Sequence, residues 1–380
     1  CAWKKKIPAA GAALSSRRRG APSLTALFRP AGSSTAANVS SAAGEEANYE
    51  YVNGRLRART RDFLPVQAVA ELACADLKGV ERSLLDTVYG PLYRREFMLT
   101  EMPLALKLEN LISASARQRF SELKRWGKGS VRLLTSALSI QSDLENGQLF
   151  LRALRSGRND YEPSMPGCGE LSAEFWRQMA RAGGDREQID ELCRYDPTVL
   201  SNVLSDAVKE LDASGRLWEA EWLYMKGSFD WAASVLKRCR DSNGAAVSRC
   251  LGYLIDLWNL RVRLGFHYGS GMQDEAVHFL EGGSLPLERL LFAKSYKALL
   301  RGSFWRSRGA EPDERSLFEL ERQYLLWQMT LRREDPLGVQ VIISYRARLF
   351  CEWRNLTTIV SGLQSGLDRA AVQSVLFIGR

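Results

Sequence analysis

Apolar and polar positions follow a helical period along most of this 380-residue chain, from Tyr49 onward. Apolar residues recur every three or four positions, as in 66-VQAVAELA-73 and 199-VLSNVLSDAV-208. This spacing predicts helices with one buried face. Gly and Pro lie mainly between the periodic segments, and no run of alternating residues ends in a hairpin turn. The pattern therefore predicts an all-α fold.

Three of the predicted helices share one arrangement, in which an acid is followed by two residues and then by Asn. The segments are 140–154, 253–267 and 349–363, and their acid and amide pairs are Asp143/Asn146, Asp256/Asn259 and Glu352/Asn355. Apolar residues stand three positions before each acid, one after it and eight after it. At about 100° per residue, these positions share a narrow sector of the helix. We expect the same buried stripe in each segment, with the acid at its edge and Asn further round.

The three segments predict an internal repeat. Their Asn residues are 113 and 96 residues apart, which suits a repeated unit of about six helices rather than a short-period solenoid. A Gly-rich loop and a predicted helix follow the first two, in 166-PGCGELSAEFW-176 and 281-EGGSLPLERL-290. In the third, the link shortens to Gly366, Leu367 and Asp368, with Asp368 as the expected N-cap of the last helix.

The acid and amide pairs have two interpretations. In the first, each pair hydrogen-bonds a neighbouring helix or loop and orients the packing. In the second, some of the pairs face a central opening and contact a partner there. Catalysis is disfavoured, because each copy offers one carboxylate without a paired acid, a base or a metal ligand.

The composition narrows the class of protein further. An apolar fraction of 45% and a charged fraction of 26% are typical of a soluble globular protein. No run approaches the roughly 18 apolar residues of a membrane-spanning helix. The seven cysteines form no C-x-x-C pair, the two histidines lack metal-ligand spacing, and no phosphate-binding Gly motif occurs. We therefore expect a cytosolic protein with reduced thiols and without metal, nucleotide or other cofactor.

Most of the net charge of +9 lies in residues 1–44, which contain seven Lys and Arg and no acid. The rest of the chain has a net charge of only +2, so a nucleic-acid partner is not indicated. Residues 1–44 show no hydrophobic period and predict a disordered basic tail, either an extension or a transit-like segment. Residues 45–380 are expected to form a single domain with repeats centred near 143–146, 256–259 and 352–355.

Several of these elements together resemble a known family. The segment 50-EYVNGRLRARTRDFL-64 has Tyr51, Arg55 and Arg57 in the arrangement of the family's opening helix, and 84-LLDTVYGP-91 resembles its next segment. The first repeat through Arg152, with 166-PGCGEL-171, also fits. From about residue 49 to 380 the chain resembles the C subunit of prokaryotic V-type (A-type) ATPases and is similar to the d subunit of eukaryotic V-ATPases. Arg152 has no counterpart in the other two copies.

The resemblance implies three similar helical bundles around a pseudo-threefold axis, forming a funnel. It also implies a non-catalytic rotor subunit that sits peripherally on the cytoplasmic face of a membrane. Its partners would be the central stalk and the membrane proteolipid ring, and it would transmit torque for ATP-coupled proton or sodium transport. The residues leave a second hypothesis open, an all-helical repeat scaffold that binds soluble protein partners. An enzyme ranks third.

Overall fold

The computed structural model describes residues 45–157, 168–268, 278–305 and 314–377, and all regular secondary structure in these ranges is helical. The prediction of an all-α fold is confirmed. The predicted tail, residues 1–44, lies outside the described residues. The predicted segments 66–73 and 199–208 correspond to α3 (Val66–Leu72) and to the first part of α10 (Val199–Ser214).

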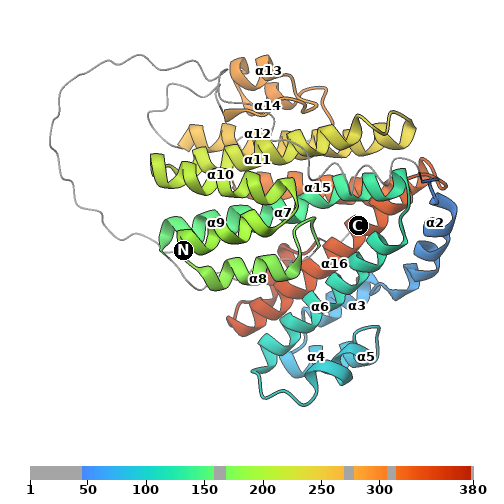
Figure 1. Cartoon of the computed structure of the whole chain (residues 1–380). Helices are drawn as coiled ribbons and strands as arrows, with labels where there is room; N and C mark the ends of the chain where they lie inside the picture. Colours follow the sequence, from blue (N-terminus) through green and yellow to red (C-terminus); the bar gives the residue numbers. More distant parts are fainter. Residues whose placement is uncertain (1–44, 158–167, 269–277, 306–313, 378–380) are drawn as a thin grey trace. The chain divides into compact units, whose positions relative to one another are not determined.

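Six long helices form the framework, and shorter helices connect them (Figure 1). The long helices are α6 (Leu104–Trp126), α7 (Ser130–Ser156), α11 (Leu217–Leu236), α12 (Ser242–Tyr268), α15 (Glu314–Thr330) and α16 (Gln340–Gln364). The shorter α-helices, besides α3 and α10, are α2 (Tyr49–Ala58), α4 (Leu77–Leu85), α5 (Gly90–Leu92), α8 (Ala173–Ala182), α9 (Arg186–Tyr195), α13 (Leu287–Phe292), α14 (Tyr296–Leu300) and α17 (Arg369–Ser374). Two 3₁₀ turns, η2 (Arg59–Asp62) and η5 (Leu331–Arg333), and a π-helical turn, η3 (Tyr93–Phe97), complete the described elements.

Local sequence sets several of the helix boundaries. The hydroxyl of Ser172 accepts a hydrogen bond from Phe175 N at 3.0 Å and starts α8, and the carboxylate of Asp76 does the same for α4 with Gly79 N at 2.8 Å. Gly157, with φ of 67°, follows α7 in the left-handed conformation that glycine adopts without a steric penalty.

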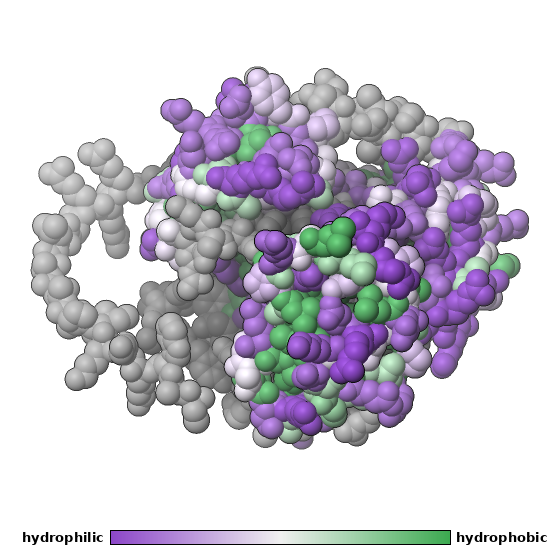
Figure 2. Space-filling view, turned by 90° about the horizontal axis from the view of Figure 1, so that it is seen from below, coloured by the Kyte–Doolittle hydropathy of each residue, from purple (hydrophilic) through white to green (hydrophobic). Residues whose placement is uncertain are grey.

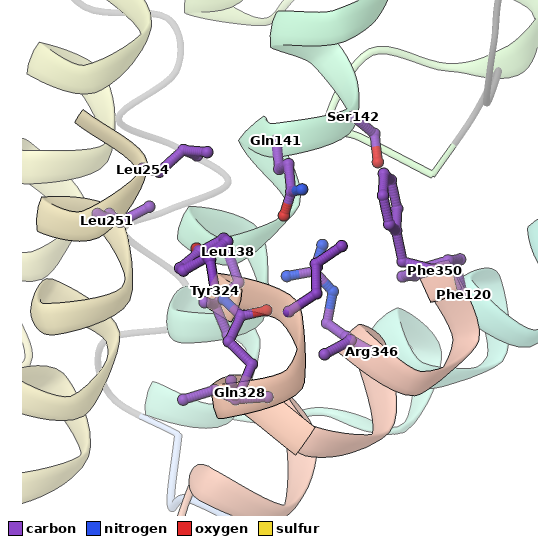
Figure 3. A pocket seen from close by; sticks show the side chains of 13 residues that line it. Phe120, Leu138, Gln141, Ser142, Leu251, Leu254, Tyr324, Gln328, Arg346 and Phe350 are labelled. Carbon is purple, nitrogen blue, oxygen red and sulfur yellow. The ribbon is translucent and has the colours of Figure 1, made fainter. Parts of the chain in front are cut away.

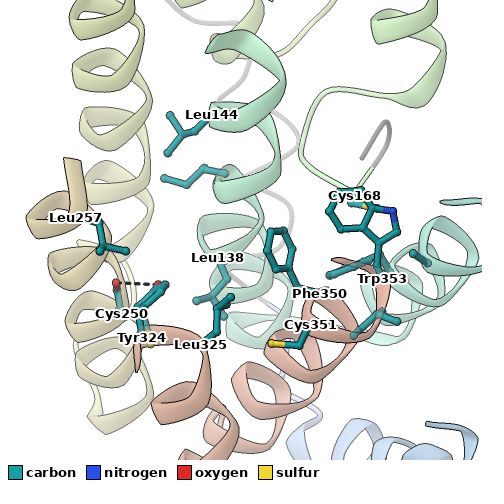
Figure 4. Packing of buried hydrophobic residues seen from close by; sticks show 14 of the residues in the cluster. Leu138, Leu144, Cys168, Cys250, Leu257, Tyr324, Leu325, Phe350, Cys351 and Trp353 are labelled. Carbon is teal, nitrogen blue, oxygen red and sulfur yellow. Dashed lines mark hydrogen bonds between the residues drawn. The ribbon is translucent and has the colours of Figure 1, made fainter. Parts of the chain in front are cut away.

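The three helices that carry the acid and amide pairs, α7, α12 and α16, lie at the centre of the packing. Helix α7 packs against α11 and α12, α12 packs against α15, and α16 packs against both α15 and α6. Figure 4 shows Leu138 and Leu144 of α7 near Leu257 of α12 and Phe350 of α16. These side chains belong to one continuous hydrophobic core, in which each fully buried large side chain contributes about 1.5–3 kcal/mol.

The expected buried stripe is present in part. Its positions are buried on α7 and α16. On α12, Leu257 is buried and Tyr253 is half-buried, and the side chain of the third position, Leu264, lies outside what the structure describes. The sequence predicts the acid at the edge of this stripe and Asn further round, but the structure buries both more deeply. All six polar side chains are no more than 5% exposed. The reason is that neighbours cover α7 and α16 on several sides, so these helices are buried almost all round instead of having one wet face.

Candidate functional site

The first acid, Asp143 on α7, binds the backbone of the loop that leads into α8. Its carboxylate accepts hydrogen bonds from Glu170 N at 2.5 Å and from Leu171 N at 3.3 Å. The loop passes so close that a Cβ on Gly169 would lie 1.9 Å from Asp143 Oδ1. Complete burial raises the pKa of Asp143 to about 7, against the opposing influence of Lys124 and the two backbone donors.

The second acid, Asp256 on α12, binds the corresponding loop before α13. It accepts hydrogen bonds from Leu285 N at 2.9 Å, from the hydroxyl of Ser284 and from Trp305 Nε1 at 2.9 Å. A Cβ on Gly283 would lie 2.4 Å from Asp256 Oδ1. Burial raises the pKa of Asp256, and the three donors oppose this rise. The Gly-rich loops singled out in the sequence are thus the places where backbone meets a buried carboxylate.

The amides pair with backbone as well. Asn259 donates to Leu280 O at 2.9 Å and accepts from Leu280 N at 2.8 Å. Asn355 makes the same two-way contact with Phe377, at 3.3 Å and 2.6 Å. Asn146 is fully buried on α7. An amide that both donates to and accepts from one residue fixes that residue as a further backbone hydrogen bond would.

The third acid, Glu352 on α16, is bound by residues from the other end of the described chain. It accepts hydrogen bonds from Leu64 N at 2.7 Å, from the Tyr89 hydroxyl at 2.9 Å and from Arg119 Nη1 at 3.0 Å. Both Glu352 and Arg119 are 5% exposed, so this is a buried ion pair. Burial, followed by the charge of Glu352, raises the pKa of Tyr89 well above its ordinary value and keeps its phenol protonated as a donor.

All three acids bind a residue that directly precedes the N-cap of a short helix. These residue pairs are Leu171–Ser172 before α8, Leu285–Pro286 before α13, and Leu64–Pro65 before α3. The sequence did contain this signal, because 63-FLPVQAV-69 resembles 284-SLPLERL-290. The sequence-based interpretation missed it by searching only downstream of Glu352. Asp368 is the N-cap residue of α17 as predicted, but its side chain makes no capping hydrogen bond and Glu352 binds elsewhere.

The remaining predicted residues lie at helix junctions. Tyr51 is 49% exposed, and the Arg55 guanidinium lies 4.7 Å from its ring centre and 5.1 Å from that of Trp126. Arg57 donates to the carbonyl of Pro336, in the loop before α16. Arg152 Nε lies 2.6 Å from Glu221 Oε1 and so links α7 to α11.

Sequence reasoning missed two residues that support these sites. Arg119 stands at a position of α6 where the helical period calls for an apolar residue, among Ile112, Ala116 and Leu123. Asn53, buried on α2, donates to two carbonyls of the loop before α16, at 2.7 Å and 3.0 Å. A polar residue inside an apolar stripe was the available signal in both cases.

Corresponding positions of the three central helices line one cavity, which we call the central cavity (Figure 3). Counted from each Asn, the residues eight and five positions earlier all face it: Leu138 and Gln141 of α7, Leu251 and Leu254 of α12, and Ala347 and Phe350 of α16. Tyr324 and Gln328 of α15 close another side. Positions at the same spacing before each Asn therefore line one cavity.

The cysteines of the described ranges offer little chemistry. Cys74 is exposed and the other five are buried. Burial raises the pKa of Cys168, Cys193, Cys250 and Cys351 to about 12, which keeps them as thiols. Among the described residues, no group of three or more His, Cys, Asp and Glu could hold a metal ion. No helix of these ranges is long and apolar enough to cross a membrane.

These features define an all-helical protein in which buried acids and amides tie long central helices to loops. The family model for the ATP synthase (C/AC39) subunit matches residues 52–375, so the chain belongs to this family. It is a family of accessory subunits and not of catalytic ones.

Curated relatives agree with this assignment. The C subunits of the V-type ATP synthases of two Thermus thermophilus strains are each 28% identical over 340 residues. Each of these matches covers 86% of this chain and 97% of the relative. The C subunit of the A-type ATP synthase of Methanococcoides burtonii is 22% identical over 355 residues, which cover 88% of this chain and 96% of the relative.

Proposed function

We propose that this chain is a non-catalytic rotor subunit of a V-type (A-type) ATPase or ATP synthase. In this role it links the central stalk to the membrane proteolipid ring and transmits torque between ATP turnover and the transport of protons or sodium ions. It works peripherally, at the cytoplasmic face of the membrane, and reaches the membrane only through the complex. Family membership over nearly all of the described chain supports the proposal.

The observation that carries the proposal is the equivalence of α7, α12 and α16. Each helix uses an acid to hold the residue before a short helix, and each presents matched positions to the central cavity. We propose that the three are copies of one helical bundle, arranged around a pseudo-threefold axis as a funnel. In this arrangement the third copy is completed by the segment from Leu64 through α6.

Torque transmission requires stiffness, and the three buried acids supply it. Each of them ties a long helix to a loop inside a close-packed interior of low compressibility. Binding to a partner also requires apolar side chains that are exposed on the surface. Figure 2 shows hydrophobic side chains gathered on the face seen from below Figure 1, where α4 and α5 lie. Exposed apolar residues of this part of the chain are Val66, Val88, Met98 and Leu99, the last of them 94% exposed.

A reconstitution experiment tests this function. The remaining subunits of the complex are assembled in liposomes with and without this chain, and ATP hydrolysis and ion uptake are measured together. We expect ion uptake to depend on the chain and the chain to co-purify with both stalk and ring. Full ion uptake without the chain would overturn the proposal. Stable binding to soluble proteins instead of stalk and ring would favour the all-helical scaffold.

A further inference from the structure

A buried arginine faces the central cavity without a counter-charge from the described residues. Arg346 of α16 is 9% exposed, and its Nε has no hydrogen-bond partner. The guanidinium lies 5.4 Å from the ring centre of Phe120. Figure 3 shows it in the middle of the cavity, below the amide of Gln141.

Two other buried arginines differ from Arg346 because each of them has a carboxylate partner. Arg119 has Glu352 at 3.0 Å, and Arg354 has Glu321 at 2.7 Å. No described carboxylate lies within ion-pair distance of Arg346. The charge of Glu170 acts on Arg346 from a distance, but Glu170 is engaged by Lys124 at 2.8 Å and by the Ser139 hydroxyl at 2.9 Å.

A guanidinium in this position needs compensation. Arginine has five N–H donors and no acceptor, and a charge buried without a partner costs several kcal/mol. Burial lowers the pKa of Arg346 to about 10, so the side chain still carries its charge at neutral pH. The neighbouring tyrosine and thiols, Tyr324, Cys168 and Cys250, are neutral at that pH because their own pKa values are raised.

The size of the central cavity limits what can supply this compensation. The cavity measures about 20 Å³, whereas roughly 10–15 Å³ is enough to hold one water molecule. A space of this size can hold a small ion. The amide of Gln141 and the hydroxyl of Ser142 line the same space as further polar groups.

We propose that Arg346 holds one monoatomic anion, chloride under ordinary conditions, in the central cavity between α7, α12, α15 and α16. The anion neutralises the guanidinium at the place where the three equivalent helices meet. Because it binds the folded chain and has no site in the unfolded one, it stabilises the fold by linkage.

Thermal unfolding of the full chain at fixed ionic strength gives the first test. Sodium gluconate is replaced stepwise by sodium chloride, and we expect the melting temperature to rise by about 2–4 °C as the site fills. The rise should disappear in Arg346→Met, which keeps the length and apolar stem of the side chain. It should persist in the control Arg194→Met, which removes an exposed arginine paired with Asp190 on α9. Equal melting temperatures in gluconate and chloride for the unaltered chain would overturn the proposal.

Crystals of the unaltered chain grown in sodium bromide give a second test that does not depend on whether Arg346→Met folds. We expect an anomalous scattering peak in the central cavity, within contact distance of the Arg346 guanidinium. Bromide peaks confined to the surface, with water in the cavity, would contradict the proposal. Neither test involves the stalk or the ring, so the outcome is independent of the proposed rotor function.

Discussion

The sites of Asp143 and Asp256 differ from the site of Glu352 in how far along the chain their partners lie. The two aspartates bind donors that follow them in the chain, 27 to 49 residues away. Glu352 binds donors 288, 263 and 233 residues away. A segment that follows the helix in sequence can close each of the first two sites, whereas the third needs both ends of the described chain in place. A buried acid therefore holds a segment that follows it in two cases and joins distant parts of the chain in the third.

The largest expected effect is at Glu352, whose partners lie furthest away along the chain. Glu352→Ala leaves Arg119 as a buried, unpaired cation and removes the acceptor for Leu64 N and the Tyr89 hydroxyl. We expect a loss of about 3–5 kcal/mol in the free energy of unfolding, measured by urea denaturation. The control is Asp212→Ala, which breaks the half-exposed pair with Arg186 and should cost less than about 1 kcal/mol.

A loss at Glu352 no larger than that of the control would mean that the N-terminal helices are held without the buried ion pair. The long-range contacts of Glu352 would then contribute no more to the free energy of unfolding than an exposed ion pair does.

The difference between the sites also explains what could be predicted from sequence. Helical period gave α3 and α10, and recurring spacing gave the acid and amide pairs with two of their loops, because these are local patterns. The third loop could not be found by continuing along the chain, because its residues, around Leu64, come before the helix that they serve. The spacing also could not predict how deeply the acids and amides are buried, because several neighbouring helices jointly cover α7 and α16. The isolation of Arg346 depends on where every carboxylate lies in space, which no sequence pattern records.

The amide contact should give the next largest effect. Asn259→Ala removes both hydrogen bonds to Leu280 and leaves a buried N–H and C=O without partners. We expect a loss of about 1–3 kcal/mol in urea denaturation. Asn110→Ala serves as the control, because Asn110 is an exposed amide of α6 and should change stability by no more than about 0.5 kcal/mol. Unchanged stability combined with lost stalk binding would instead assign Asn259 to the partner interface.

The close approach of loop and carboxylate can be tested through its glycines. Gly169→Ala places a methyl group against the carboxylate of Asp143, where the ideal Cβ position is 1.9 Å from Oδ1. We expect a cost of about 1–3 kcal/mol, because the loop must withdraw and lengthen its hydrogen bonds. Gly184→Ala, in the turn between α8 and α9, meets no atom within 4 Å and should be neutral or slightly stabilising. Equal effects of the two substitutions would show that the loop before α8 adapts freely.

The smallest effect concerns the charge state of Asp143. The pKa of Asp143 is about 7 in the folded chain and about 3.9 in the unfolded one, so between these values the folded state binds more protons. Stability contributed by this group is therefore complete below about pH 4, falls as the pH rises towards 7, and is constant above that. Burial also raises the pKa of Glu145 to about 7, so the unaltered chain contains two contributions of the same sign.

Comparing the unaltered chain with Asp143→Asn isolates the Asp143 contribution, because the amide does not titrate. Urea denaturation at pH 5 and pH 7.5 should show the unaltered chain losing about 1–2 kcal/mol more than the variant over this interval. If Asp143→Asn left the pH dependence unchanged, Lys124 and the backbone donors of the loop would be sufficient to keep Asp143 ionised despite its complete burial.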